Sequence, residues 1–578
     1  MRKTTQILLV AAASLAQAWA GDKVAADLAR SAGTVEVLVQ YKSAPGAVAE
    51  AGIRQRGGSV TATFAKSKTL AASIAASALA GLAADPDVLY VSPNRTVSAR
   101  LDYAMPTIGA DVAASYGLTG EGIGVAIVDS GIDNHWDLTN NVAGSYALKK
   151  SRIVYAESFV PGEMGKNAGA VKDAFGHGTL VAGIASGTGW SSTGTIYTKT
   201  FRGVAPRVNL ISLRALDATG KGTDTAVIAA IQRAIELKTT FNIRVLNLSL
   251  GRPVFESFTK DPLCQAVEAA WRAGIVVVVA AGNDGRNNSA GTAGYGTIDS
   301  PGNDPLVITV GAMKTSSTPY RADDRIASYS SKGPTAIDHV VKPDLVAPGN
   351  RIVSLASAVK SSLSNTYPTN NVKYSEYQIG GNPTPSYVYY RLSGTSMAAP
   401  MVSGAAALLL QKTPSLTPDQ VKARLMKTAS KAFPSTSNAT DPLTGETFYS
   451  QYDIFTVGAG YLDITAALNN TDLAAGSARS PVAVYNATTG EAKLVDGSSV
   501  IWRDSVIWGD SVIWADSVIW GTGVISGTSV IWGTSSLKGS SVIWGDSVIW
   551  GDSVIWGDNS KTSALGSTWI SIALNGEN

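Results

Sequence analysis

Cysteine is nearly absent from this sequence: Cys264 is the one cysteine among 578 residues. No disulfide bond can therefore form within the chain, which excludes a disulfide-stapled fold. Cys264 lies in the helix-like stretch PLCQAVEAAWRAG, where a small core residue is its simplest interpretation. Histidine is also scarce, with His135, His177 and His339 only. An imidazole base for any thiol or hydroxyl nucleophile must be one of these three.

Charge is sparse and balanced. Charged residues make up 16% of the chain, with 47 basic and 44 acidic residues and a net charge of +3. This excludes a highly charged disordered protein, and no clustered basic footprint points to nucleic acid. Beyond the N-terminus no apolar run approaches the ~18 residues that span a bilayer, so we expect no membrane span. Apolar residues (45%) suffice for a sizeable core, and the length predicts two to four structural units at roughly 100–200 residues each.

The N-terminus has the three-part pattern of a signal peptide. The basic start MRK is followed by an apolar run from Ile7 to Ala16 and by Ala18-Trp19-Ala20. We predict cleavage after Ala20 and a secreted protein, extracellular or at the cell surface. A short buried helix is the alternative, but it does not explain this order of charge and small residues.

The remaining sequence predicts two α/β regions. In residues 34–97, VEVLVQY reads as a strand, Ala71 to Ala83 as a helix and DPDVLYVSPN as a turn with a strand. From about 101 to 475, buried-looking strands alternate with amphipathic helices; the strands are GVAIVDSG, VNLISLRAL, IRVLNLSLG, GIVVVVAAGN and LVITVGA. Continuous Val/Ile/Leu runs are typical of parallel strands covered on both faces. We predict an α/β fold with a doubly wound, mostly parallel sheet.

Polar residues follow several of these strands, where sites form in open α/β sheets. Asp129 ends the buried strand GVAIVDSG, and His177 begins a small-residue helix with a glycine on each side. Alone, Asp129 fits an ordinary turn aspartate and His177 a capping residue. The functional interpretation is a buried carboxylate and a base that a substrate or another backbone can approach closely.

Ser396 and Asn283 complete the set of candidates. Ser396, in SGTSMAAPMVSG, stands at a loop-to-helix junction, where unpaired N–H groups suit an oxyanion beside a serine nucleophile. An ordinary N-cap serine is the alternative. Asn283 ends the apolar strand VVVVAAGN and is either a turn residue or a side-chain donor to an oxyanion.

Together, the segments GHGTLVAG and GTSMAAPMVSG and the chain order Asp129, His177, Ser396 resemble the subtilisin-like serine peptidase family over roughly residues 34–475. The resemblance implies that Asp129 orients the base, His177 transfers the proton, Ser396 attacks and Asn283 donates to the oxyanion. It implies an endopeptidase that works through an acyl-enzyme and needs no cofactor for catalysis.

The same resemblance implies a substrate site. Ser249, Leu250 and Gly251, in NLSLG, match the segment that lines the primary specificity pocket and pairs with an extended polypeptide. Gly220 and Gly222 match the opposite edge. Neither stretch contains a carboxylate or a basic cluster, so we expect a broad preference that leans toward apolar or aromatic side chains.

Family members often bind structural calcium. Asp137 is the candidate ligand here, but the loop from Gly187 to Phe201, which would supply its partners, has diverged. Calcium binding is therefore left open. A Tyr-rich insertion between Asn350 and Ser393 is either a surface loop or hairpin, or a lip over the cleft.

The resemblance divides the chain into segments. DPDVLYVSPNRTV resembles the family's pro-segment, which assists folding, blocks the cleft as an inhibitor and is released near residues 98–104 by the enzyme itself. The predicted segments are a signal peptide at 1–20, a pro-segment at 21–100, a peptidase domain at 101–475, a linker at 476–498, a hexapeptide repeat at 499–558 and a tail at 559–578.

The repeat consists of ten uninterrupted hexads of the type SVIWGD. Four β-favouring residues followed by two turn residues predict a strand and a corner, arranged either as a small β-solenoid or as stacked hairpins. No hexad contains a nucleophile paired with a base, so the repeat does not carry catalysis. The options for the repeat are binding to a surface or polymer, self-association, help with export, or a β-module that has no partner. The alternative function is a surface adhesion or assembly protein with the peptidase fold as scaffold.

Overall fold

The computed structural model describes most of the chain between Lys23 and Val495, and short pieces beyond it. The described residues are 23–25, 28, 33–94, 103–140, 150–289, 291–357, 361–441, 444–486, 491–495, 513–514, 518–520, 525–526, 530–532, 536–538, 572 and 574–577. The predicted signal peptide and residues 98–102 of the predicted release region (98–104) lie outside these residues. The chain divides into two compact units, Met1–Ala99 and Arg100–Asn578.

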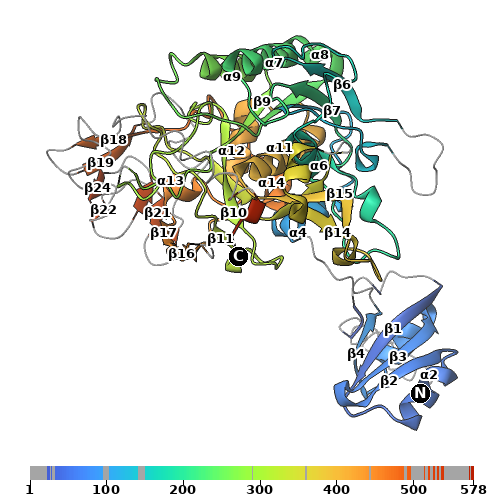
Figure 1. The fold of residues 1–578 in the computed structure, drawn as a ribbon. Coiled ribbons are helices and arrows are strands. Elements are labelled where there is room, and N and C mark those ends of the chain that lie inside the picture. Colours follow the sequence, from blue (N-terminus) through green and yellow to red (C-terminus); the bar gives the residue numbers. More distant parts are fainter. Residues whose placement is uncertain are drawn as a thin grey trace. The chain divides into compact units, whose positions relative to one another are not determined.

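In its described residues, the first unit forms a four-stranded antiparallel sheet with two helices. The strand order is β2-β3-β1-β4. The elements, blue in Figure 1, are β1 (Thr34–Tyr41), α2 (Ala47–Gln55), β2 (Ser59–Phe64), β3 (Thr69–Ala75), α3 (Leu79–Ala83) and β4 (Val88–Pro93). Val37, Val39, Ile53 and Val91 are fully buried in a core of its own.

The predicted helix from Ala71 to Ala83 is wrong in its first half. Residues 69–75 form the central strand β3, which pairs with β1 and β2, and only Leu79–Ala83 is helical. Leu70, Ala72 and Ile74 alternate toward the core, each 1% exposed or less. Pairing with β1 on one side and β2 on the other, rather than the helix preference of alanine, decides the local structure.

The second unit is built on an eight-stranded sheet of order β11-β10-β9-β8-β5-β7-β6, with β12 paired to β10. All neighbours are parallel except β10 and β11. The five predicted strands and the mostly parallel sheet are confirmed. The strands are β5 (Gly124–Asp129), β6 (Ile153–Ser158), β7 (Asn209–Arg214), β8 (Ile243–Leu248), β9 (Val276–Ala280), β10 (Ile308–Lys314), β11 (Arg325–Ile326) and β12 (Leu345–Pro348).

Helices cover both faces of this sheet, with α7 and α9 on one side and α6 and α11 on the other (Figure 1). The helices of the unit are α4 (Ala104–Thr107), α5 (Ala110–Ala113), α6 (His177–Ser186), α7 (Asp224–Glu236), α8 (Lys238–Phe241), α9 (Pro262–Arg272), α10 (Ser362–Thr366), α11 (Thr395–Lys412), α12 (Pro418–Thr428), α13 (Ile454–Val457) and α14 (Ile464–Asn469). None of the described helices is long and apolar enough to cross a bilayer.

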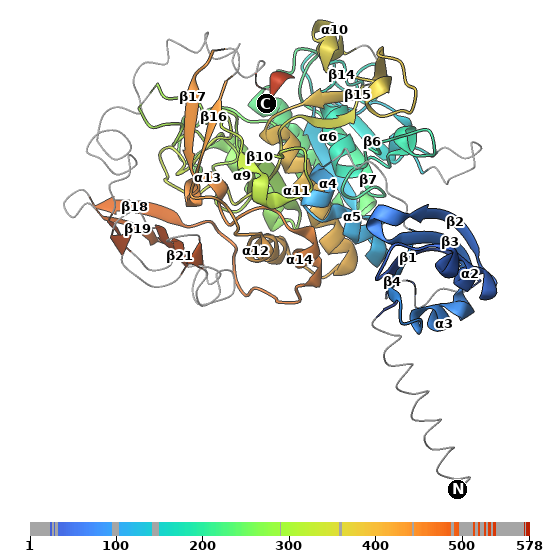
Figure 2. The same cartoon turned by 90° about the horizontal axis from the view of Figure 1, so that it is seen from below.

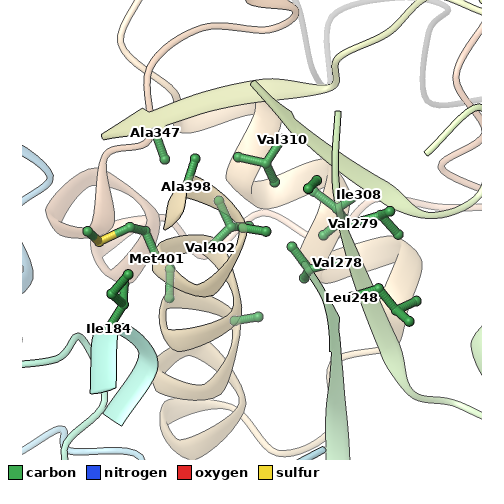
Figure 3. Close-up of a cluster of buried hydrophobic side chains, with 14 of the residues drawn as sticks. Ile184, Leu248, Val278, Val279, Ile308, Val310, Ala347, Ala398, Met401 and Val402 are labelled. Atoms are coloured by element: carbon green, nitrogen blue, oxygen red, sulfur yellow. The ribbon is translucent and has the colours of Figure 1, made fainter. Parts of the chain in front are cut away.

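Helix α11 runs through the core and is buried on nearly every side. Figure 3 shows Ala398 and Val402 directed at the strands, while Met401 points at Ile184 of α6. A helix that is apolar all round must be enclosed, because no face is suited to water. Its position fixes Ser396, in its first turn, at the same end of the sheet as the residues that follow the parallel strands.

The Tyr-rich insertion folds into a three-stranded antiparallel sheet of order β13-β15-β14, formed by β13 (Ile352–Leu355), β14 (Asn371–Lys373) and β15 (Pro385–Leu392). Tyr377, Tyr389 and Tyr390 are at most 2% exposed. The ring of Tyr377 stacks on Tyr197, in the diverged loop from Gly187 to Phe201. The insertion therefore contains the antiparallel pair β14–β15, as in a hairpin, to which β13 adds a third strand, and most of its tyrosines serve packing.

The segment predicted as a linker is partly bound to the second unit. Ala478 N donates to Asp419, and Ser480 Oγ donates to the buried carboxylate of Asp344. Ala483 N donates to the carbonyl oxygen of His339. The strands of this C-terminal part are β16 (Thr436–Thr440), β17 (Thr447–Gln451), β18 (Val482–Asn486) and β19 (Glu491–Val495).

Most of the hexapeptide repeat lies outside the described residues. Its described pieces are the strands β20 (Ile513–Trp514), β21 (Val518–Trp520), β22 (Ile525–Ser526), β23 (Val530–Trp532) and β24 (Ser536–Lys538). Parallel pairs join β21 to β23 and β22 to β24, as in a solenoid, whereas β20 and β21 form an antiparallel pair, as in a hairpin. The choice between the two architectures stays open.

The chain returns to the second unit after the repeat. Figure 2 shows the C-terminal piece in red beside α10 and β14. The side chain of Glu577, in a residue 5% exposed, pairs with Arg286 at 3.1 Å and accepts hydrogen bonds from the backbone N–H (2.7 Å) and the hydroxyl of Ser328. Asn350 exchanges two hydrogen bonds with the backbone of Glu577. Described residues before the repeat (478–483) and after it (Glu577) are thus bound to the second unit.

Candidate active site

Asp129 and His177 meet where β5 ends and α6 begins. His177 Nδ1 lies 2.8 Å from Asp129 Oδ1 and 3.0 Å from Oδ2. A carboxylate only accepts hydrogen bonds, so Nδ1 carries the proton and donates it. The other ring nitrogen, Nε2, is then an acceptor in the neutral imidazole. The carboxyl side chain is 1% exposed and the imidazole 14%, which leaves one side of the ring accessible.

A second buried carboxylate, Asp173, holds the loop that carries His177. Its Oδ1 accepts from Ser130 Oγ and Gly176 N, and its Oδ2 accepts from Thr179 N, each at 2.7 Å. Burial raises the pKa of Asp173 to about 6, against the effect of these hydrogen bonds. We did not identify Asp173 from the sequence as a supporting residue. Its position four residues before His177, in DAFGHGT, is the signal that was available.

Charges around His177 control its protonation. Burial acts to lower the pKa of the imidazole, but the charge and hydrogen bond of Asp129, with the charge of Asp173, outweigh burial and raise it above 6.5. An imidazolium in this position is therefore stabilised relative to water. This is the property that a general base requires once it has taken a proton.

The glycine after His177 is required by the packing. A Cβ atom at Gly178 would lie 2.2 Å from the carbonyl oxygen of Gly131 and 3.1 Å from Cβ of Asp129. At this glycine the backbone of Gly131 lies directly against the segment that carries His177. Any side chain here would push α6 away from the end of β5 and separate His177 from Asp129.

Ser396 is the second residue of α11 and is bound to the segment after β8. Its Oγ donates to the carbonyl oxygen of Ser249 at 3.1 Å, and Ser249 Oγ donates to the carbonyl oxygen of Ser396 at 2.8 Å. A hydroxyl has one proton, so in this conformation it is not donated to His177. At the start of α11, the N–H of Thr395 donates to Asn283 Oδ1 and that of Met397 to the carbonyl oxygen of Gly394. Among the described residues none accepts a hydrogen bond from the N–H of Ser396, so this group is available as a donor.

Asn283 is held in a defined orientation. Its Oδ1 accepts from Thr395 N at 2.9 Å and from Thr395 Oγ1 at 3.2 Å. These contacts fix which end of the amide faces α11. Within the described chain, no residue accepts a hydrogen bond from Nδ2, so this N–H group is free to donate to a ligand beside Ser396.

The predicted substrate-binding segments lie near these residues. Ser249, Leu250 and Gly251 follow β8, and Ser249 contacts Ser396 as described. On the other side, Gly222 pairs with Leu216 in a small turn. A Cβ at Gly220 would lie 2.5 Å from the ring of Phe175, whose centroid is 6.3 Å from that of His177.

The sequence reasoning missed a carboxylate beside the specificity segment. A Cβ at Gly251 would lie 2.8 Å from Cβ of Asp299, and a Cβ at Gly282 would lie 2.7 Å from Asp299 Oδ2. Asp299 precedes Ser300 and Pro301 in the loop between β9 and β10. Only the three-dimensional contact links it to the segment from Ser249 to Gly251, since 48 positions of the chain separate Asp299 from Gly251.

The surroundings of Asp137 do not fit calcium. Its carboxylate is fully buried, with Oδ1 accepting from Ser191 N and Oδ2 from the Tyr389 hydroxyl, both at 2.9 Å. Calcium prefers a shell of six to eight oxygen acceptors, whereas donors occupy both oxygens here. In the described part of the chain, no group of three or more His, Cys, Asp or Glu side chains is placed to hold a metal ion.

A mostly parallel α/β sheet with a carboxylate–histidine pair and a serine at a helix start is typical of serine hydrolases. Comparison with known proteins defines the class more narrowly. Residues 120–446 match the sequence profile of the Subtilase family of peptidases, and the chain belongs to this family. It is therefore a subtilisin-like serine endopeptidase.

Several curated proteins are similar to the chain over most of their length. It is 37% identical to serine protease AprX of Bacillus subtilis (strain 168) over 367 residues, which cover 62% of this chain and 73% of AprX. It is 34% identical to subtilisin E of the same organism over 381 residues, 65% of this chain and 79% of subtilisin E. The alkaline protease of Alkalihalobacillus alcalophilus is 31% identical over 348 residues, 60% and 70% of the two chains.

Proposed function

We propose that this peptidase cleaves peptide bonds through Asp129, His177 and Ser396, by way of an acyl-enzyme, and that it acts outside the cell. The proposal rests mainly on the 2.8 Å hydrogen bond between His177 Nδ1 and Asp129 Oδ1. That bond leaves Nε2 as a proton acceptor. The serine at the start of α11 and the oriented amide of Asn283 support the same assignment.

In the first step, Ser396 Oγ attacks the substrate carbonyl carbon while His177 Nε2 takes the hydroxyl proton. This requires the hydroxyl to rotate from the carbonyl oxygen of Ser249 toward His177. The carbonyl π electrons move to oxygen, and the oxyanion accepts hydrogen bonds from Asn283 Nδ2 and the backbone N–H of Ser396. Asp129 stabilises the imidazolium that forms.

In the second step, the C–N bond breaks and the departing amine takes the proton from His177. Water then attacks the acyl ester while His177 Nε2 takes one of its protons. As the C–O bond to Ser396 Oγ breaks, that proton passes to Ser396 Oγ and restores the hydroxyl. Ser249, Leu250 and Gly251 bind the polypeptide as an added strand, with Gly220 and Gly222 on the opposite edge. None of these steps uses a cofactor.

The remaining segments extend this proposal. Residues 1–20 direct export, and residues 21–100 fold as a pro-segment that inhibits the enzyme until its release; the compact sheet of the first unit supports an independent segment. The repeat at 499–558 binds a surface or self-associates as an accessory. No contact in the described chain favours the alternative of an adhesion protein that uses the peptidase fold only as scaffold.

The test compares wild type with Ser396→Ala. Wild-type enzyme removes the pro-segment of the variant in trans, and the variant is then separated by an affinity tag. We expect kcat on a peptide substrate to fall by roughly 10⁶-fold with an unchanged circular dichroism spectrum. Full activity of the folded variant would refute the proposal.

A further inference from the structure

We propose that Asp299 determines specificity, and that the enzyme cleaves after a cationic residue, lysine or arginine. This inference rests on the proposed function, because it concerns the side chain that precedes the bond attacked by Ser396. It replaces the sequence-based expectation of an apolar or aromatic preference, which rested on the absence of a carboxylate from two stretches of the chain.

The position of Asp299 is set by the ends of two adjacent parallel strands. Gly251 follows β8 and Gly282 follows β9, and these strands pair directly. The backbone N–H of Asp299 donates to the carbonyl oxygen of Ala281 at 3.0 Å, which brings its side chain against both glycines. Neither glycine has a Cβ to fill the space, and a Cβ at either position would come within 3.3 Å of Asp299 Oδ2.

This location coincides with the path of a substrate side chain. Ser249 contacts the Ser396 hydroxyl, and Asn283 directly follows Gly282. A carbonyl group attacked by Ser396 and bound by Asn283 Nδ2 therefore lies beside the 249–251 and 281–283 segments. The side chain of the same substrate residue extends between these segments, toward the Asp299 carboxylate.

Asp299 lacks a cation of its own. Among the described residues none donates a hydrogen bond to its carboxylate, although the residue is only partly exposed. The nearby Arg252 donates hydrogen bonds to two other carboxylates, Asp224 at 3.0 Å and Asp261 at 2.9 Å. A carboxylate left partly buried without a partner is costly, and a substrate ammonium or guanidinium group would supply the missing charge and donors.

A second carboxyl group, that of Asp284, adds to the negative electrostatic potential around Asp299. Burial, and then the charge of Asp284, raise the pKa of Asp299 well above its usual range, while Arg252 acts to lower it. Burial also raises the pKa of Asp284. In the free enzyme Asp299 is therefore neutral at low pH and ionises as pH rises. The preference for a cation should grow in the same direction, and a bound cation lowers the pKa of Asp299.

The sequence of the predicted self-processing region gives a second argument for cleavage after a cationic residue. The predicted self-processing region, residues 98–104, reads SARLDYA and contains one basic residue, Arg100. An enzyme that cleaves after a cationic residue would release its pro-segment between Arg100 and Leu101. The first residue of the mature protein would then be Leu101.

The experiment uses mature wild-type enzyme and peptides that differ only in the residue before the cleaved bond: lysine, arginine, glutamine, methionine, leucine, phenylalanine or glutamate. We expect kcat/KM for lysine or arginine to exceed that for glutamine or methionine at least tenfold (~1.4 kcal/mol) at alkaline pH. The ratio should shrink as pH falls. A preference for leucine or phenylalanine over both cations would overturn the proposal, and this readout needs no variant.

Variants assign the effect to Asp299. Asp299→Asn and Asp299→Ser should bring the lysine-to-glutamine ratio close to one while cleavage of the glutamine peptide persists. The control Asp111→Asn, at an exposed carboxylate on α5, should keep the wild-type ratio. An unchanged ratio in both Asp299 variants would refute the assignment. Failure of the wild type to cleave any peptide would instead refute the proposed catalytic function.

Discussion

The hydroxyl of Ser396 donates its hydrogen bond to the carbonyl oxygen of Ser249, 3.1 Å away. This contact joins the proposed nucleophile to the segment that we propose binds the substrate strand. A substrate placed between Ser396 and Ser249 would compete for this space and free the hydroxyl to turn toward His177. Substrate binding would thus allow the Ser396 hydroxyl to form its hydrogen bond to His177, which completes the proposed triad.

Asn283 offers a graded test of oxyanion stabilisation. Asn283→Ala removes the free Nδ2 donor, and removal of one such donor typically lowers kcat by about 10²–10³. KM should change little, because the charge on the oxygen develops only in the transition state. Steady-state kinetics on one peptide measures both constants. A variant that loses binding but keeps kcat would show that Asn283 serves the ground state.

The pH profile reports on His177. Its neutral form is the base, and its pKa is raised above 6.5, so kcat/KM should rise with pH along a limb centred above that value. Asp129→Asn removes the main cause of the rise and the acceptor for Nδ1–H; kcat should fall roughly 10⁴-fold. A limb centred well below 6.5 in the wild type would contradict the account.

Asp173 acts through His177 as a positioning residue. Asp173→Asn removes a charge that raises the pKa of His177, so the acid limb should move to lower pH. The amide also turns one acceptor into a donor facing an N–H or O–H group, which should cost about 1–3 kcal/mol of stability. The pH profile separates the two effects, since a purely structural role would lower stability without moving the limb.

Substitutions of Asp137 and Tyr389 test whether calcium binds at Asp137. Since protein donors occupy both oxygens of Asp137, Asp137→Asn should destabilise the fold by a similar amount in EDTA and in millimolar calcium. Tyr389→Phe should destabilise it as well, by about 1–3 kcal/mol, because one buried acceptor loses its donor. Thermal inactivation rates in the two buffers provide the measurement. A calcium-dependent difference confined to the Asp137 variant would show that the ion binds there.

A substitution of Glu577 tests whether the C-terminal segment stabilises the peptidase unit. Glu577→Gln breaks the pair with Arg286 and leaves a donor against Ser328, which should cost about 1–3 kcal/mol. The variant should inactivate faster on heating than the control Glu446→Gln, an exposed residue in the turn between β16 and β17. Equal inactivation rates would mean that the C-terminal segment does not stabilise the peptidase unit.

Local pattern was sufficient to predict much of the fold, and it singled out the four main candidate residues, whose roles stay predictions. The strand that ends in Asp129 is apolar throughout, and small residues flank both His177 and Ser396. These neighbouring residues are enough to identify the three positions from the sequence. The strand at 69–75 was missed because its alanines favour a helix locally, whereas pairing with β1 decides the outcome.

Contacts between distant parts of the chain could not be predicted in this way. Tyr389 reaches Asp137 across 252 positions, and its hydroxyl closes the place where calcium was considered. Asp299 approaches Gly251 only because β8 and β9 are neighbours in the sheet. The fit of a carboxylate between two glycines depends on that register, which the sequence of either strand alone does not specify.

Labelling with a serine-directed phosphonate tests the central claim most directly. Mature enzyme would be titrated with the reagent, and the labelled peptide identified by mass spectrometry. The account predicts one phosphonyl group per chain, bonded to Ser396, with activity lost in proportion to labelling and no labelling of His177→Ala. Labelling at another serine, or full activity after Ser396 has been modified, would contradict it.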